Sequence, residues 1–344
     1  MASHRRPKQQ SRARVTVLTT AAAAAVVLSA NAANAAPSQK LSKDQVKAKV
    51  DELYQQAEQA TEKYDGAQAK QQKLQKEIST IQDNVARGQQ DLNKLRDSLG
   101  SLATSQYRSG GIDPSVQLFL SSNPNDFLDK ASTLDQLSAQ QVDALKKIQD
   151  KQRELSQERA EATQKLKDLS DTRAQLAQNK KDVQGKLADA QKLLNSLTAK
   201  EKQQLAAEQQ RADRSSSQRV DLGNTPPASG RAAAAFAAAQ SQIGKPYVYG
   251  ATGTASYDCS GLTSWAYAQA GVSIPRTSQE QATIGTRISS VNDLQVGDLV
   301  FFYGDIHHVG LYAGNGQVLH APHTGAVVRY ESMSDMPFQF GVRV

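Results

Sequence analysis

The chain has 344 residues, of which 22% are charged and 5% aromatic, and its formal net charge is +7 at pH 7. This length allows about two domains. Five of the 41 basic residues lie within the first 35 positions, and the rest of the chain has 36 basic residues against 34 acidic ones. The charge therefore does not indicate a nucleic-acid-binding protein, and we expect no nucleic-acid partner.

Residues 1–35 have the order of a secretory signal peptide. A basic segment at residues 5–14 precedes an alanine-rich apolar run at residues 15–30, and residues 33–35 (Ala-Asn-Ala) offer a cleavage site flanked by small residues. The alternative is a membrane anchor, but a spanning helix needs about 20 apolar residues, and this run is shorter. We predict that the mature protein is secreted, and is extracellular or associated with the cell wall.

Residues 41–214 are predicted to form a coiled-coil domain, because their composition favours long helices and apolar residues recur at a and d spacing. The first series is Ile78, Ile81, Val85, Leu92, Leu95, Leu99 and Leu102, and the second is Leu166, Leu169, Leu176, Val183, Leu187, Ala190, Leu194 and Leu197. Glycines and prolines at residues 109–126 interrupt the helical pattern. We expect an antiparallel hairpin, with an intermolecular coil as the alternative.

The turn between the two arms is unusually apolar for an exposed segment, with Val116, Leu118, Phe119 and Leu120. Exposed apolar surface favours a docking site. We expect a membrane or cell-division protein to bind the coiled coil there.

Residues 215–230 are rich in Ser, Pro and Gly and predict a flexible linker. Beyond it, residues 231–344 hold 13 of the 18 aromatic residues and are predicted to form an ordinary globular core. Their pattern predicts helices at 231–243, 259–270 and 278–283, followed by strands at 298–303, 308–313, 317–321, 327–331 and 339–344. Helices followed by an antiparallel sheet make an α+β domain.

Cys259 is the only cysteine in the chain, so it cannot form an internal disulfide. It begins a predicted helix, where the partial positive charge and free N–H groups favour the thiolate and can hold an oxyanion. Asp258 opposes this effect, so a cationic partner is needed, and histidine is the usual one.

Four of the five histidines lie in the last 40 residues. His308 and His320 fall on adjacent predicted strands, which favours a pair in which His308 is the base and His320 orients it. A core histidine is the alternative for His320, and His307 and His323 are predicted to be loop or rim residues. Cysteine and histidine are also zinc ligands, but no regular short spacing supports a zinc site, and we predict no cofactor.

Residues 240–332 resemble the NlpC family of papain-like cell-wall peptidases. The matching segments are GKPYVYG at 244–250, YDCSGL at 257–262, IPRTSQEQ at 274–281, LQVGDLVFF at 294–302, HVGLYAGNG at 308–316 and VLHAP at 318–322. The sequence departs from the family at 249–251, where Tyr-Gly-Ala replaces Trp-Gly-Gly, and at 296–298, where Val-Gly-Asp replaces Pro-Gly-Asp. The first departure puts the subsite preference in doubt.

The resemblance implies a papain-like fold with Cys259 as the nucleophile, His308 rather than His307 as the base, and His320 as the third polar residue. It also implies that Tyr247 faces the cysteine. Further residues predicted to position the oxyanion or substrate are Asp258, Ser260 and Arg276. The segment at 122–138 is similar to coiled-coil regions that precede such domains in cell-wall hydrolases of Gram-positive bacteria.

The family implies a peptidoglycan endopeptidase that hydrolyses the bond between D-γ-glutamate and the diamino acid of the stem peptide through a Cys-His-His thiol mechanism. A second hypothesis is an interaction protein whose catalytic domain is silent or held off. A third is transfer of the acyl group to an amine or alcohol instead of water.

The coiled coil is a candidate restraint on the enzyme, because a short tether gives a high effective concentration. We expect the helix nearest the linker, residues 193–214, to lie over the active-site groove, while the tip receives an activating partner. The alternative is a passive spacer.

Overall fold

The computed structural model describes residues 40–108, 116, 124–215 and 220–344. The chain divides into residues 1–41 and residues 42–344. The predicted signal peptide lies outside the described residues, as does the apolar tip apart from Val116, which is exposed. Within the described part, no helix is both long and apolar enough to cross a membrane.

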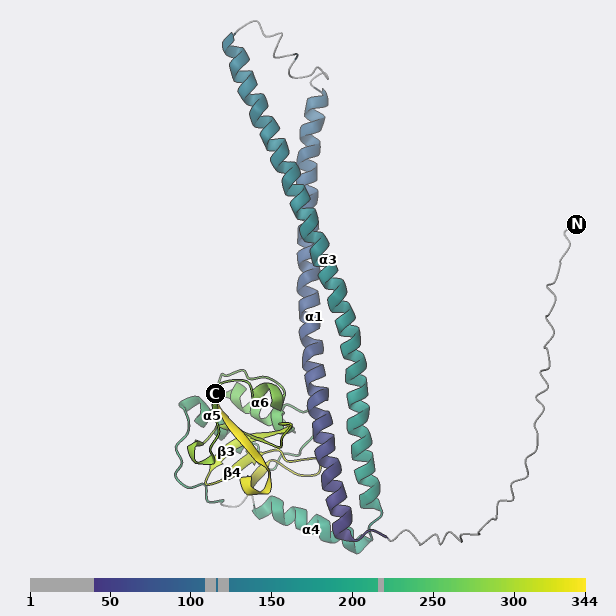
Figure 1. The fold of residues 1–344 in the computed structure, drawn as a ribbon, viewed down its shortest axis with the longest axis vertical. Helices are drawn as coiled ribbons and strands as arrows, with labels where there is room; N and C mark the ends of the chain where they lie inside the picture. Colours follow the sequence, from purple (N-terminus) through teal and green to yellow (C-terminus); the bar gives the residue numbers. More distant parts are fainter. Residues whose placement is uncertain (1–39, 109–115, 117–123, 216–219) are drawn as a thin grey trace, which may run out of the picture. The chain divides into compact units, whose positions relative to one another are not determined.

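Two long helices, α1 (Lys43–Arg108) and α3 (Pro124–Asn195), pack against each other along the chain's helical part (Figure 1). Two apolar clusters join them, one made of Leu74, Ile78 and Leu169 and the other of Leu92, Ile148 and Leu155. Rising residue numbers on α1 meet falling numbers on α3, so the helices are antiparallel. The predicted all-α antiparallel hairpin is confirmed.

The helical part differs from the prediction at two places. Leu166, assigned to the heptad seam, is 51% exposed, so it lies outside the apolar contact. The second arm also breaks before α4 (Ala199–Ser215). Thr198 and Glu201 cap this helix reciprocally, with Thr198 N donating to the Glu201 carboxylate at 2.8 Å and Glu201 N donating to Thr198 Oγ1 at 3.3 Å.

The described part of the predicted linker, residues 220–230, packs against the C-terminal domain. Val220 and Leu222 pack against the core of the C-terminal domain. Pro227 forms an isolated bridge with Val296, and Ala228 N donates to Val296 O at 3.1 Å. The expectation of a flexible coil is therefore wrong for residues 220–229, because their side chains and backbone are tied to the domain.

The C-terminal domain begins with three helices, α5 (Gly230–Gln240), α6 (Cys259–Gln269) and α7 (Ser278–Gln281). An antiparallel six-stranded sheet follows, in the order β1-β6-β2-β3-β4-β5. Its strands are β1 (Thr286–Ile288), β2 (Leu299–Phe302), β3 (His308–Gly314), β4 (Gln317–His320), β5 (Arg329–Ser332) and β6 (Phe338–Arg343). Two short 3₁₀ turns are Val291–Asp293 and Met333–Asp335. The predicted α+β class is confirmed, whereas the three-residue β1 and the two 3₁₀ turns were not predicted.

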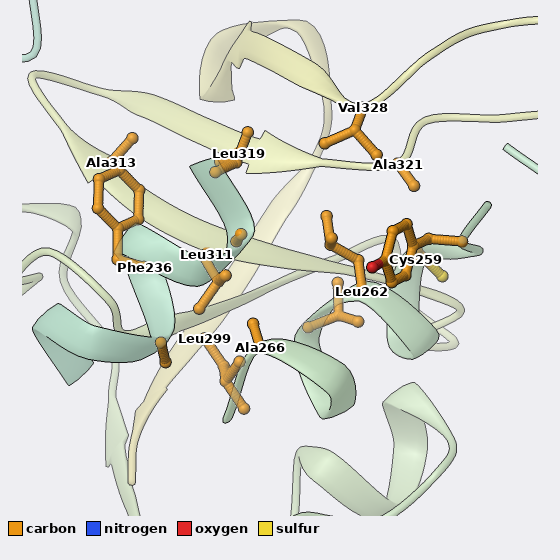
Figure 2. Packing of buried hydrophobic residues seen from close by; sticks show 14 of the residues in the cluster. Phe236, Cys259, Leu262, Ala266, Leu299, Leu311, Ala313, Leu319, Ala321 and Val328 are labelled. Atoms are coloured by element: carbon orange, nitrogen blue, oxygen red, sulfur yellow. The ribbon is translucent and has the colours of Figure 1, made fainter. Parts of the chain in front are cut away.

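The core lies on both faces of this sheet. Leu299 and Phe301 of β2 pack in the cluster that holds the helix residues, whereas Val300 and Phe302 pack in a second cluster. Figure 2 shows Cys259 at one end of the first cluster, far from Phe236 of α5. Cys259 is thus fixed by the same packing that holds α6 on the sheet.

The register of β3 and β4 puts the two predicted site histidines on one face. Leu311 pairs with Leu319 and Tyr312 with Val318, so His308, Gly310 and His320 share a face. A Cβ on Gly310 would lie 2.4 Å from Val318 Cγ2 and 3.0 Å from the Cβ of His320. Glycine is needed here because any side chain would collide with β4 beside His320.

The helical hairpin gives a direct test of the packing. Leu92→Ala removes a side chain that is 3% exposed and should lower the free energy of unfolding of the helical part by about 3 kcal/mol. The matched control is Leu166→Ala, which should change it by less than about 0.5 kcal/mol. Melting curves followed by far-ultraviolet circular dichroism measure both, and equal losses would contradict this packing.

Candidate active site

Cys259 is the first residue of α6, and Asp258 caps that helix. The Asp258 carboxylate accepts a hydrogen bond from Gly261 N at 2.7 Å. Arg276 holds the same carboxylate through both guanidinium nitrogens, at 3.1 and 2.5 Å, and also donates to Ser260 Oγ at 2.8 Å. Arg276 pairs with Asp258 and partly offsets its negative charge, but this charge still contributes to raising the pKa of Cys259, as expected from the sequence.

His308 and His320 are brought together as predicted. Both are buried, and Nε2 of His308 lies 2.7 Å from Nδ1 of His320. Because Nε2 faces His320, the other ring nitrogen of His308, Nδ1, is left for the cysteine side of the site. Ligand-type atoms of His308 and Cys259 lie within 4.8 Å of each other.

Behind this pair lies Glu331 of β5, which the sequence interpretation missed. His320 Nε2 is 3.2 Å from Glu331 Oε2, and Arg329 donates to the same oxygen at 3.1 and 2.8 Å. An ionised carboxylate only accepts, so His320 carries its proton on Nε2 and leaves Nδ1 to accept from His308. Glu331 thereby fixes the tautomer of the orienting histidine.

The charges of this chain are consistent with that tautomer. Burial is the main cause that lowers the pKa of His320 to about 4, with a smaller contribution from His308 and against the hydrogen bond of Glu331, so the ring is neutral near pH 7. Burial acts to raise the pKa of Glu331, but the hydrogen bond with His320 and the charge of Arg329 outweigh it and hold that pKa below its ordinary value.

The other predicted residues fall into two groups. Tyr247 is buried in the same core cluster as Cys259, and burial and then the charges of Glu58 and Cys259 raise its pKa well above the ordinary value. His323 lies in a loop and is partly exposed, as predicted for a rim residue. His307 also lies in a loop, as predicted, but it is buried there, with 2% of its surface exposed. Its ring stacks on Tyr303 and hydrogen-bonds Asp305.

The site is covered by three acidic residues of α1 that the sequence interpretation did not include. Glu58 Oε1 lies 2.5 Å from Nδ1 of His308, and Glu62 Oε1 lies 3.6 Å from Sγ of Cys259. Asp65 Oδ2 is 3.1 Å from Arg276 Nη2. Their spacing of four and three residues places them on one helix face, a signal present in the sequence but also typical of a solvated helix.

The segment predicted to cover the groove, residues 193–214, lines the same cavity as His308 and His320, but the element seated on the cysteine is α1. Residues 193–214 do touch the domain, since Asp213 of α4 accepts from Arg329 at 2.8 Å. The cysteine and the histidine are nevertheless contacted by α1. In an antiparallel hairpin, the start of the first arm lies at the same end as the finish of the second, and Lys43 accordingly pairs with Glu208 at 2.8 Å.

The acids of α1 change the protonation of Cys259 and His308, the candidate catalytic pair. Burial and then the charges of Glu58 and Glu62 raise the pKa of Cys259 well above its ordinary value, so its thiol stays protonated. Burial opposes a charge on His308, but the charge and hydrogen bond of Glu58 raise its pKa above the ordinary value. The histidine is thus paired with a carboxylate rather than with a thiolate.

One group of metal-ligand types occurs among the described residues. Glu58, Cys259 and His308 each offer one ligand atom, all within 4.8 Å, and carboxylate, thiolate and imidazole are zinc ligands. The hydrogen bond between Glu58 and His308 already uses two of these atoms. We therefore assign the cluster to the covered catalytic pair.

Comparison with known proteins finds relatives of the C-terminal domain. The model of the NlpC/P60 family matches residues 244–341. A probable endopeptidase from Corynebacterium glutamicum is 50% identical over 117 residues, which are 34% of this chain and 56% of that protein. The probable endopeptidase p60 of Listeria seeligeri is 46% identical over 100 residues, which are 28% of this chain and 18% of that protein.

Among solved structures, the NlpC/p60 domain of the peptidoglycan hydrolase SagA is similar, with 37% identity and a TM-score of 0.32. The match covers 33% of this chain and 98% of that one. The chain spans about half the length of the first curated relative that it matches, so the likeness concerns the C-terminal domain.

The role of Glu331 can be tested by nuclear magnetic resonance of the imidazole nitrogens in the full chain. Glu331→Ala removes the acceptor for Nε2–H of His320, and we expect a mixture of tautomers in place of one. Glu331→Gln keeps an acceptor oxygen and should retain the Nε2–H form. An unchanged tautomer in Glu331→Ala would show that the carboxylate does not select it.

Proposed function

We propose that this chain, whose residues 244–341 form an NlpC/P60 domain, is a secreted peptidoglycan endopeptidase. Its substrate in this proposal is the stem peptide, cleaved between D-γ-glutamate and the diamino acid. The observation that carries the proposal is the arrangement of Cys259 at the head of α6 beside the linked pair His308 and His320. The curated relatives matched by this domain are named probable endopeptidases, and this supports the reaction class.

The proposed chemistry follows from the positions of the side chains once α1 has left the site. His308 Nδ1 takes the proton of Cys259, and the thiolate attacks the peptide carbonyl. The first N–H groups of α6 have no partner within the helix and suit the oxyanion. His308 then protonates the leaving amine and activates a water that hydrolyses the thioester. His320 holds the ring of His308 in place throughout.

Export is a further part of the proposal, supported by the basic, apolar and small-residue order of residues 1–35. Peptidoglycan lies outside the cytoplasmic membrane, so an exported enzyme would meet its substrate. A membrane or cell-division protein that binds the helical hairpin remains our proposal for a partner.

The products decide between hydrolysis and acyl transfer. Residues 220–344 lack α1 but keep Val220 and Leu222, which pack on the core. This segment should digest soluble muropeptides into two fragments that mass spectrometry identifies, with water added across the γ-glutamyl bond. Products carrying an added amine or alcohol would instead indicate a transferase, and a cut elsewhere would reject the proposed bond.

Cys259→Ala in this segment should abolish turnover, because no other thiol is present in the chain. The fold should survive, since alanine fits the space of the cysteine. Muropeptide digestion followed by chromatography measures the loss, with circular dichroism as the check on folding. Residual digestion by a folded Cys259→Ala variant would reject the thiol mechanism.

The neighbouring histidines should separate clearly. His308→Ala should lower kcat by about a thousandfold or more, whereas His307→Ala should change it little, because the ring of His307 stacks on Tyr303. His320→Ala should cost less than His308→Ala, since it acts through the base. Rates are compared per folded molecule. A larger loss for His307→Ala than for His308→Ala would show that His308 is not the base.

A further inference from the structure

We propose that residues 54–65 of α1, here called the covering segment, are a built-in inhibitor that must leave the active site before substrate enters, and that their release is favoured by rising pH. This regulation rests on the proposed function for what the site does when it is open. The contacts that close the site do not depend on that function.

The first contact replaces the thiolate. In a thiol peptidase the imidazolium of the base is paired with the cysteine thiolate. Here the carboxylate of Glu58 takes that position, 2.5 Å from Nδ1 of His308, and both side chains are buried. With His308 already neutralised by Glu58, Cys259 has no cation to stabilise its thiolate, and the covered enzyme lacks its nucleophile.

The second contact occupies space beside the sulfur. One oxygen of Glu62 accepts from Ser260 Oγ at 2.7 Å, and the other accepts from the backbone N–H of Ser278 at 2.7 Å. Glu62 is 3% exposed and Cys259 is fully buried. A substrate carbonyl cannot approach Sγ while this carboxylate is seated there, so closure is steric as well as electrostatic.

Two aromatic contacts lie near the two ends of the covering segment. Tyr54 stacks on His323, with ring centroids 5.1 Å apart, and Tyr64 meets Tyr249 edge to face at 6.1 Å. Residues 54–65 span about 17 Å at 1.5 Å per residue. Over this length α1 contacts the rim at both ends and the catalytic pair between them, which distinguishes a seated segment from a passing contact.

The acids around Arg276 make closure depend on protons. Asp258, Glu62 and Asp65 surround this one guanidinium, which lies 2.5 Å from Asp258 and 3.1 Å from Asp65. Burial and then the charge of Asp258 raise the pKa of Glu62 to about 7 and that of Asp65 to about 9. The covered site therefore retains protons that exposed carboxyl groups would lose.

The sign of the pH effect follows from these shifts. Acids whose pKa is raised in the covered form stabilise that form fully below their ordinary pKa, and this contribution is lost as pH rises to the shifted pKa. Closure should therefore weaken as pH rises from the ordinary carboxyl range to about 7 for Glu62 and to about 9 for Asp65. The pair of Glu58 with His308 acts in the same direction, because the imidazolium loses its proton on the alkaline side. The other charged or titratable groups that face the covering segment are Tyr247, Tyr249, Cys259, Tyr303 and His323, and Glu331 acts on His308 from behind.

The lone cysteine gives a direct readout of closure in the full chain, because thiol alkylation can label only Cys259. Glu58→Ala combined with Glu62→Ala should accelerate labelling at pH 7 by about tenfold or more, since the sulfur becomes accessible and regains its cation. The matched control is Glu52→Ala, which removes an exposed acid of α1 just before the covering segment and should label as slowly as the parent chain. Equal labelling of the parent chain and the double variant would overturn the proposal.

Glu58→Gln guards against misfolding of the double variant. It keeps the size of the side chain and removes only the charge, so it should still accelerate labelling by about threefold or more. Melting curves of each variant must show an intact hairpin. A folded Glu58→Gln variant that labels as slowly as the parent chain would contradict the role assigned to the Glu58 charge.

The pH dependence is measured as the ratio of parent to double-variant labelling rates, which cancels the ordinary ionisation of a thiol. This ratio should rise towards one between pH 6 and pH 9 as the covering segment leaves. Asp65→Asn imitates the protonated acid and should keep the ratio low at pH 9. A ratio that stays constant with pH would reject proton-linked release.

The same samples separate this proposal from the proposed function. Faster labelling of the double variant without muropeptide cleavage would support the inhibitory role of the covering segment and would reject the proposed endopeptidase activity. Cleavage by residues 220–344, combined with equal labelling of the parent chain and the double variant, would support the endopeptidase activity and reject the inhibitory role of the covering segment.

Discussion

The state of this site depends on one hydrogen bond, between Glu58 of α1 and Nδ1 of His308. The other nitrogen of His308 continues the contact to His320, then to Glu331, and Glu331 is held by Arg329. Arg329 in turn donates to Asp213 of α4. The line of polar contacts through the catalytic domain thus begins on one helix of the N-terminal part and ends on another, so both ends respond to where those helices lie.

The compensation of buried charges differs between the two ends of this line, and it determines which contacts stabilise the covered state and which favour release of α1. Arg329 joins Glu331 and Asp213, so each charge at that end has a partner. At the other end Glu62, Asp65 and Asp258 share Arg276, and neither oxygen of Asp65 forms a hydrogen bond within the described residues. Buried carboxyl groups without full compensation destabilise the form that buries them. Packing and hydrogen bonds therefore stabilise the covered state, whereas the excess of buried carboxyl groups around Arg276 destabilises it.

The sequence predicted what short-range patterns control. A helix beginning at Cys259 and a strand beginning at His308 follow from local caps and alternation, and both are present. The break before α4 also had a local signal in Thr198 and Glu201, whereas the three residues of β1 are too few to show alternation. The contact of Glu58 with His308 joins residues 250 positions apart, and an acidic helix face ordinarily meets water. Only the tertiary arrangement shows that it meets a histidine.

One of the departures from the family pattern lies in a part of the groove that α1 contacts. Gly250 stands at φ +73°, where glycine is favoured. A Cβ there would also lie 3.2 Å from the Tyr64 ring of α1, and the neighbouring Tyr249 meets the same ring edge to face. The Tyr-Gly-Ala at 249–251, in place of Trp-Gly-Gly, thus lines a wall that α1 contacts directly. Under the proposed function this wall also meets the substrate, so we expect a substitution there to change both the subsite preference and how firmly α1 closes the site.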